Sequence, residues 1–151
     1  MTKRSAALAA LLAFAATHTL AEPGVTDTTI LLGASNAMTG AVAATCAPAT
    51  YGAKAWFDKV NRDGGIHGRK IQYNVLDDAW SAQRAVANAR RLVEQDGVFA
   101  ILGGCATPTS AAILQYVTGQ PEVPYMFPWA AMNELTEPVK RHLYRDKVRR
   151  I

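Results

Sequence analysis

The sequence predicts an α/β fold of the doubly wound, Rossmann-like type, with helices on both faces of a parallel sheet. Short apolar runs alternate with longer stretches of helical periodicity, which gives the order βαβαβαβ. The run 98–102 (VFAIL) is apolar at every position, as expected of a central strand covered on both faces. Half of the 151 residues are hydrophobic and 19% are charged, a composition that excludes wholesale disorder, collagen-like repeats and coiled coil.

The first half of the chain contains one strand, one loop and one long helix. A strand is predicted over 28–35 (TTILLGAS), followed by a loop of small residues and a helix over 49–62. The Asp63-Gly64-Gly65 run ends this helix, because glycine adopts the left-handed conformation after a helix at little cost. The predicted buried face of the helix consists of residues near helical spacing: Tyr51, Ala55, Trp56 and Val60.

The second half repeats the alternation. The predicted elements are a strand over 69–76, a helix over 82–96, a strand over 98–102, a helix over 109–118 and a strand over 123–127. The helix over 82–96 carries one apolar stripe, made of Ala82, Ala85, Val86, Ala89, Leu92 and Val93. Pro124 has no N–H for a sheet, so the strand over 123–127 is the least regular of the four.

This topology predicts where a ligand binds. In open parallel sheets, ligands lie beyond the carboxyl ends of the strands. The loops expected at that edge are rich in small residues and poor in charge: 35–49, 77–81, 105–109 and 128–132. Small residues let backbone groups approach a ligand, and helices that begin in such loops favour an anionic group. The loops therefore suit a small polar molecule better than acid–base chemistry.

Several functional classes are excluded by missing signatures. The loop 33–40 (GASNAMTG) lacks the dinucleotide fingerprint, and no phosphate-binding P-loop occurs. The body of the chain, 22–137, has 8 Lys and Arg against 11 Asp and Glu, so it lacks the basic surface of a nucleic-acid-binding domain. We expect no nucleic-acid partner, no cofactor, no metal site and no catalytic residue.

Three groups at the predicted edge have both a structural and a functional interpretation. Asp77 and Asp78 are adjacent on an extended chain and point apart, so capping or turn bonding is favoured over an acid–base pair. Thr107 and Thr109 have no base nearby to activate them, which favours helix capping. Trp129 follows a strand at the expected mouth, where it either packs in the rim or stacks on a ligand.

The first twenty-one residues read as a secretory signal peptide. Lys3 and Arg4 form a positive start, 6–16 is an apolar run, and small residues precede a cleavage site after Ala21. A membrane anchor would need about 18–20 apolar residues, and this run is much shorter. We therefore predict export to the periplasm.

Export permits a disulfide between Cys46 and Cys105, the two cysteines of the chain. Both are expected in loops at the carboxyl ends of the first and third strands, which are neighbours in a sheet of order 2-1-3-4. The required Cα separation of about 4.4–6.8 Å is then attainable. The alternative is two free thiols.

The order and spacing of several segments resemble the leucine/isoleucine/valine-binding protein family, the periplasmic substrate-binding components of ABC importers. The segments are TGAVAATCAPATYGAKAWFDKVNRDGGIHGRKI (39–71), LDDA (76–79), AVANARRLVEQDGVFAILGG (85–104), TPTSAA (107–112) and VPYMFP (123–128). The resemblance implies that 22–137 is the N-terminal α/β lobe of a two-lobed protein that closes over an amino acid or a similar small solute. It implies an ABC permease as partner and no enzymatic activity. A ligand-sensing receptor module built on the same fold is the alternative.

The resemblance also implies ligand-binding positions. The loop after the third strand supplies a hydroxyl and backbone groups, here Ala106 and Thr107, to the carboxylate and ammonium of the ligand. The segment after the fourth strand supplies backbone at Trp129, Ala130 and Ala131. Thr45 and Cys46 match the rim position after the first strand.

The sequence departs from the family in three respects. Family members are more than twice as long, so only one wall of the interlobe cleft is expected here. From about Leu143 onward, the basic tail 138–151 no longer resembles the family, as expected of a truncated or frameshifted reading frame. Trp80 stands where some relatives have a cysteine, so a bridge must involve Cys46 instead.

Overall fold

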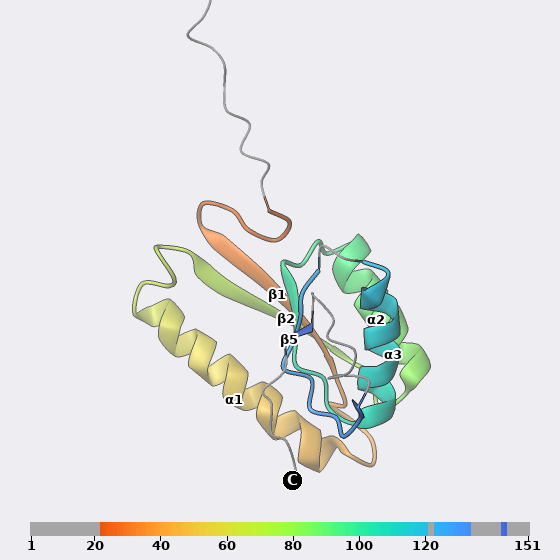
Figure 1. The fold of residues 1–151 in the computed structure, drawn as a ribbon. Coiled ribbons are helices and arrows are strands. Elements are labelled where there is room, and N and C mark those ends of the chain that lie inside the picture. Colours follow the sequence, from red (N-terminus) through yellow and green to blue (C-terminus); the bar gives the residue numbers. More distant parts are fainter. Residues whose placement is uncertain (1–21, 121–122, 134–142, 145–151) are drawn as a thin grey trace, which may run out of the picture.

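The computed structural model describes residues 22–120, 123–133 and 143–144. They form a parallel sheet with helices on both faces (Figure 1). In chain order the elements are β1 (Thr29–Asn36), α1 (Ala43–Arg62), β2 (Lys70–Asp77), α2 (Ala82–Glu94), β3 (Ala100–Leu102), α3 (Thr107–Thr118), β4 (Tyr125–Met126) and β5 (Leu143–Tyr144). The strand order is β2-β1-β3-β4-β5, and every neighbouring pair is parallel. The predicted fold class and the predicted order of the first four strands are therefore confirmed.

The main core lies between the sheet and the α2–α3 layer. α2 buries Ala85, Ala89 and Leu92, which confirms the centre of its predicted stripe, whereas Ala82 at its start is exposed. The other fully buried large side chains of this core come from β3, β4, α3 and the turn before β3: Ile101, Tyr125, Ile113 and Val98. Figure 1 shows α2 and α3 side by side on this face, with α1 on the opposite one.

The predicted buried face of α1 is wrong for three of its four residues, Tyr51, Ala55 and Trp56, which are exposed, and right for Val60, which is half-buried. Tyr51 and Trp56 are each 61% exposed. The face toward the sheet is formed, at the same helical period, by Cys46, Ala47, Thr50, Ala53, Phe57 and Val60. The prediction included Tyr51 and Trp56 because they are large and apolar, although the helical period fits either face.

The start of α1 also differs from the prediction. The helix begins at Ala43, six residues before the predicted start, and it contains Pro48. Proline removes one intrahelical hydrogen bond, which favours a helix start after it. The alanines at 43, 44 and 47 are strong helix formers and carry the helix through this point.

The two short strands at one side of the sheet were partly missed. β4 covers Tyr125–Met126, shorter than predicted, because Pro124 cannot donate to the ladder. β5, Leu143–Tyr144, lies within the predicted tail and pairs with β4, so these two residues extend the sheet. The predicted signal peptide (1–21) and the rest of the tail (138–142 and 145–151) lie outside the described residues.

Within the part of the chain that the structure describes, no helix has the length and apolar character needed to cross a membrane.

Candidate functional site

A cavity of about 230 Å³ lies at the carboxyl edge of the sheet. It opens where β1 and β3 end and where α1 begins. Its lining consists of Asn36, Cys46, Ala49, Thr50, Ala53, Tyr73, Leu102, Gly103, Gly104, Cys105, Phe127 and Trp129. The cavity therefore occupies the edge at which the topology predicts a ligand.

Cys46 and Cys105 form a disulfide at the wall of this cavity. The sulfur atoms are 2.06 Å apart and the Cα atoms 5.6 Å apart, within the range that the pairing requires. The sequence placed Cys46 in a loop, but it lies in the first turn of α1 because the helix begins early. Both cysteines are buried, at 1% and 6% exposed, and pack with Ala37. The bridge thus ties the start of α1 to the loop after β3.

The segments after β3 and β4 lie side by side. The Trp129 N–H donates to the Gly104 carbonyl at 2.7 Å, and the Ala106 N–H donates to the Trp129 carbonyl at 3.2 Å. These bonds continue the parallel pairing of β3 and β4 beyond the strands. One residue further, the Ala131 N–H donates to Thr107 Oγ1 at 3.2 Å. Two loops far apart in sequence therefore present their backbones as one surface.

The structure brings most of the sequence-predicted site residues to this edge. Cys46 and Trp129 line the cavity itself. Ala106, Thr107 and Ala131 lie beside it, at the start of α3 and in the paired segment. Ala130, in the same segment, is buried at 6% exposed. Thr45 lies on the exposed side of the first turn of α1 and does not line the cavity.

The hydroxyls of Thr107 and Thr109 do not cap α3, so that interpretation is wrong. The N-cap residue is Ala106, which has no side-chain cap bond and a left-handed backbone with φ of 81°. Thr109 Oγ1 instead donates to the Cys105 carbonyl at 2.8 Å, while Thr107 Oγ1 receives the Ala131 N–H. The two threonines fasten the loops on either side of the helix start.

Asp77 and Asp78 bond turns, as the first interpretation of this pair predicts. Asp77 accepts from the Thr39 hydroxyl at 2.6 Å and from the backbone N–H groups of Met38 and Ala79, both at 2.9 Å. Burial acts to raise its pKa, but these hydrogen bonds together hold the pKa of Asp77 at about 2. The carboxylate is thereby fixed as an anchor between the loops after β1 and β2.

Asp78 has the opposite electrostatic environment. It is fully buried and accepts from the Ser35 hydroxyl at 3.0 Å and from the Trp80 N–H at 2.9 Å. Burial is the largest influence and raises the pKa of Asp78 above its usual range. Neither aspartate lines the cavity, so the pair serves the loop structure.

The lining residues that were not predicted as site residues include four with polar or aromatic side chains: Asn36, Thr50, Tyr73 and Phe127. Asn36 is a polar residue at the carboxyl end of a strand, and that position was an available signal. Tyr73 lies within β2, and its ring packs edge-on against Phe57 at a centroid distance of 5.2 Å. Burial raises the pKa of Tyr73 to about 12.

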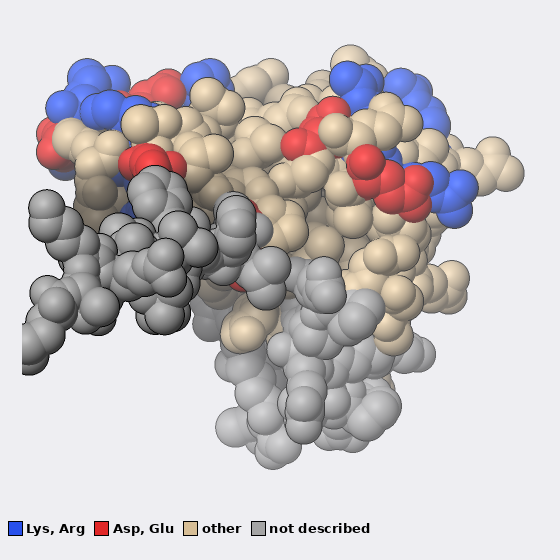
Figure 2. Space-filling view, turned by 90° about the horizontal axis from the view of Figure 1, so that it is seen from above, with Lys and Arg blue, Asp and Glu red and all other residues tan. Residues whose placement is uncertain are grey.

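No charged side chain of the described residues lines the cavity. In contrast, Lys, Arg, Asp and Glu gather in two separate groups of mixed sign on the face seen in Figure 2, which is viewed from the top of Figure 1. Among the residues that the structure covers, no cluster of His, Cys, Asp and Glu could hold a metal ion. The site is thus suited to holding an uncharged portion of a molecule next to exposed backbone groups.

Comparison with known proteins shows similarity to periplasmic binding proteins. A family profile described as "Periplasmic binding protein" matches residues 29–144. An amino acid binding protein of Pseudomonas aeruginosa is 36% identical over 97 residues, covering 64% of this chain and 24% of its own length. A Leu/Ile/Val-binding protein homolog of Brucella melitensis is 35% identical over 102 residues, covering 65% of this chain and 27% of its own length.

A solved structure shares the fold. The branched-chain amino acid transporter substrate-binding protein LivJ of Streptococcus pneumoniae, in complex with isoleucine, superposes with a TM-score of 0.66 at 28% identity. The match covers 70% of this chain and 30% of that protein. The chain therefore spans about a quarter to a third of the length of these relatives.

Proposed function

The chain belongs to the periplasmic binding protein family, and from this membership we propose that it is part of the substrate-binding component of an ABC importer. The proposed solute is a branched-chain or related amino acid, or a similar small polar molecule. The observation that carries the proposal is the family match over 29–144, which includes both paired segments at the carboxyl edge.

The paired segments supply the polar half of the proposed site. Thr107 stands in the first turn of α3, whose backbone N–H groups favour a carboxylate, and Ala106 precedes it as the N-cap residue. Ala130 and Ala131 run alongside, and their carbonyl oxygens, each able to accept more than one hydrogen bond, would accept from an ammonium or amide. The Thr107 hydroxyl accepts from the Ala131 N–H and so joins the two segments. These residues would bind the charged ends of the solute.

The cavity supplies the apolar half. Trp129 and Cys46 line it, and Thr45 lies on the exposed side of the same helical turn as Cys46, which is consistent with a rim position. The disulfide gives the loop after β3 a fixed position relative to α1. We assign the bridge a positioning role, because both sulfur atoms are consumed in it.

The proposed biology follows the family. Residues 1–21 act as an export signal cleaved after Ala21, and the mature protein works in the periplasm. The solute is enclosed in a cleft between this lobe and a second one, and an inner-membrane ABC permease receives it. This lobe then forms one wall of the cleft.

The direct test is calorimetric titration of the full gene product with L-leucine, L-isoleucine, L-valine and a panel of other amino acids. We expect binding of at least one solute. Thr107→Val should weaken that binding about tenfold, because it removes one hydrogen-bonding group from the polar half. Thr118→Val is the matched control, since its hydroxyl bonds the Leu114 carbonyl at the far end of α3.

A transport assay separates the importer from the sensory alternative. Deletion of the gene should abolish uptake of the bound solute. Unchanged uptake, together with loss of a transcriptional or behavioural response to the solute, would instead favour the receptor module.

A further inference from the structure

Three of the twelve residues that line the cavity at the carboxyl edge are aromatic. Tyr73, Phe127 and Trp129 all line it. Tyr73 is held in place by its edge-on contact with Phe57. The rest of the lining is mostly backbone and small side chains, with no charged group among the described residues. Such a wall favours a flat apolar group over a charged one.

Two of these rings are displayed to solvent. Phe127 is 50% exposed and Trp129 is 61% exposed. Phe127 also has a left-handed backbone, with φ of 55°, which is rare for a bulky residue and unfavourable. Its N–H is bonded to the carbonyl of Tyr144, which fixes this conformation. The fold thus presents apolar rings at the mouth of the cavity instead of burying them in its core.

Asn36 adds a polar group to the cavity whose oxygen needs a hydrogen-bond donor. Asn36 is one of the lining residues, is only 4% exposed, and donates from its Nδ2 to Thr50 Oγ1 at 2.8 Å. Its Oδ1 has no hydrogen-bond partner among the residues that the structure describes. A buried acceptor without a partner is costly, so a bound molecule that brings a donor to it gains affinity.

Building on the proposed function, we propose that the solute carries an aromatic ring that enters this cavity, with a ring hydroxyl or N–H donating to Asn36 Oδ1. The cavity has the required size, because an apolar cavity of about 150 Å³ accepts benzene, and this one measures about 230 Å³. The ring stacks against Tyr73, Phe127 and Trp129, while the polar end of the solute reaches the segments at Thr107 and Ala131. A branched aliphatic side chain would fill the cavity without satisfying Asn36.

The test titrates the full gene product, freed of bound solute, with L-tyrosine, L-phenylalanine, L-leucine and 4-hydroxybenzoate. We expect L-tyrosine or 4-hydroxybenzoate to bind at least tenfold more tightly than L-leucine. L-tyrosine should bind about tenfold more tightly than L-phenylalanine, because only its ring carries a donor for Asn36. The two phenols differ in the ammonium group, so their ranking distinguishes an aromatic amino acid from an aromatic acid.

A pair of tryptophan variants locates the binding. Trp129→Ala should weaken the binding of the phenols about tenfold or more. Trp56→Ala is the matched control, because Trp56 is equally exposed at 61% but lies on α1 away from the cavity. We expect Trp56→Ala to leave the affinities unchanged.

The outcomes separate this inference from the proposed function. Tighter binding of L-leucine than of both phenols, or an unchanged affinity in Trp129→Ala, overturns the aromatic assignment and leaves the proposed function standing. Absence of binding by all four probes and by the amino acid panel overturns both.

Discussion

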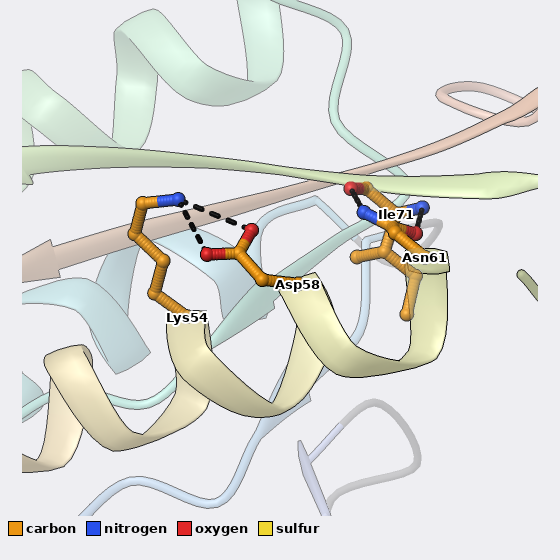
Figure 3. A network of polar contacts seen from close by, with 4 residues as sticks. All are labelled: Lys54, Asp58, Asn61 and Ile71. Carbon is orange, nitrogen blue, oxygen red and sulfur yellow. Dashed lines mark hydrogen bonds and ion pairs between the residues drawn. The ribbon is translucent and has the colours of Figure 1, made fainter. Parts of the chain in front are cut away.

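The Asn61 side chain pairs with both backbone groups of Ile71. Its Nδ2 donates to the Ile71 carbonyl oxygen at 2.8 Å, and its Oδ1 accepts from the Ile71 N–H at 2.7 Å (Figure 3). β2 is at the edge of the sheet, and the Lys70 N–H beside it bonds inward to the Thr28 carbonyl. The backbone N–H and carbonyl of Ile71 therefore point outward from the sheet, while the residue is buried, and Asn61 takes the place of a neighbouring strand. Edge strands that are covered in this way are protected from pairing with other chains.

We predict that Asn61→Ala lowers the free energy of unfolding by about 1–3 kcal/mol, because it leaves both backbone groups of Ile71 unpaired. Urea denaturation of the variant measures the loss. Lys54→Ala is the control on the same helix: its ion pair with Asp58, also drawn in Figure 3, spans 3.1 Å but is exposed. Its removal should change stability by about 0.5 kcal/mol or less. Equal effects of the two variants would contradict the assigned role of Asn61.

Gly104 is required by the packing of the loop after β3. Its φ is 129°, and a Cβ placed on it would lie 2.3 Å from the Tyr125 hydroxyl, which belongs to a fully buried ring. Gly104→Ala should therefore destabilise the fold by about 2 kcal/mol or more.

Gly52 provides the opposite case. It lies in α1, and a Cβ there would meet no atom within 4 Å. Gly52→Ala should stabilise the chain by about 0.5–1 kcal/mol, since alanine is the better helix former. Thermal melting of both variants tests the pair, and a tolerated Gly104→Ala would show that Tyr125 has room to move.

The disulfide should contribute strongly to stability. Cys46 and Cys105 are 59 residues apart, and the chain-entropy account gives about 4 kcal/mol for closing a loop of that size. Melting with and without a reductant should show a corresponding loss of stability. Mass spectrometry of unreduced, alkylated protein from the periplasm provides the check, because two alkylated cysteines would contradict the bridge.

Asp77 and Asp78 should give pH dependences of opposite sign. The pKa of Asp77 in the folded chain, about 2, lies below its ordinary value of about 3.9, so its contribution is present above that ordinary pKa and is lost as the pH falls toward 2. The pKa of Asp78 is raised, so ionising it in the folded chain opposes stability as the pH rises through and above the ordinary value.

The corresponding test compares Asp77→Asn and Asp78→Asn with the parent chain by chemical denaturation between pH 2 and 7. The advantage of the parent over Asp77→Asn should grow with rising pH. Its advantage over Asp78→Asn should shrink over the acidic range. Parallel curves for the two variants would contradict the assigned environments.

The parts of the fold that depend on hydrophobic pattern were predictable. The stretch 98–102 is apolar throughout and holds the central strand β3, and the stripe of α2 was read at Ala85, Ala89 and Leu92. The buried face of α1 was not predictable in this way. Side-chain size favoured Tyr51 and Trp56, which are exposed, whereas the smaller Cys46 and Thr50 are the residues that are buried. β5 escaped prediction because two residues give no period.

The candidate site was predictable in location but not in content. Strand order placed the loops of Cys105 and Trp129 at one edge. The cavity wall depends on Tyr73, which lies in the middle of β2, and on the left-handed backbone of Phe127. Neither feature has a local sequence signal, because both arise from tertiary packing.

The most direct test of the central claim, that this lobe forms one wall of a solute-binding cleft, is chemical-shift mapping by NMR. The isotope-labelled full gene product is titrated with the solute that binds most tightly in calorimetry. We predict that the largest backbone shifts within this lobe cluster at 103–107 and 127–131. Shifts centred on the opposite edge, at the amino ends of β1 and β2, or no shifts within the lobe at saturation, would contradict the claim.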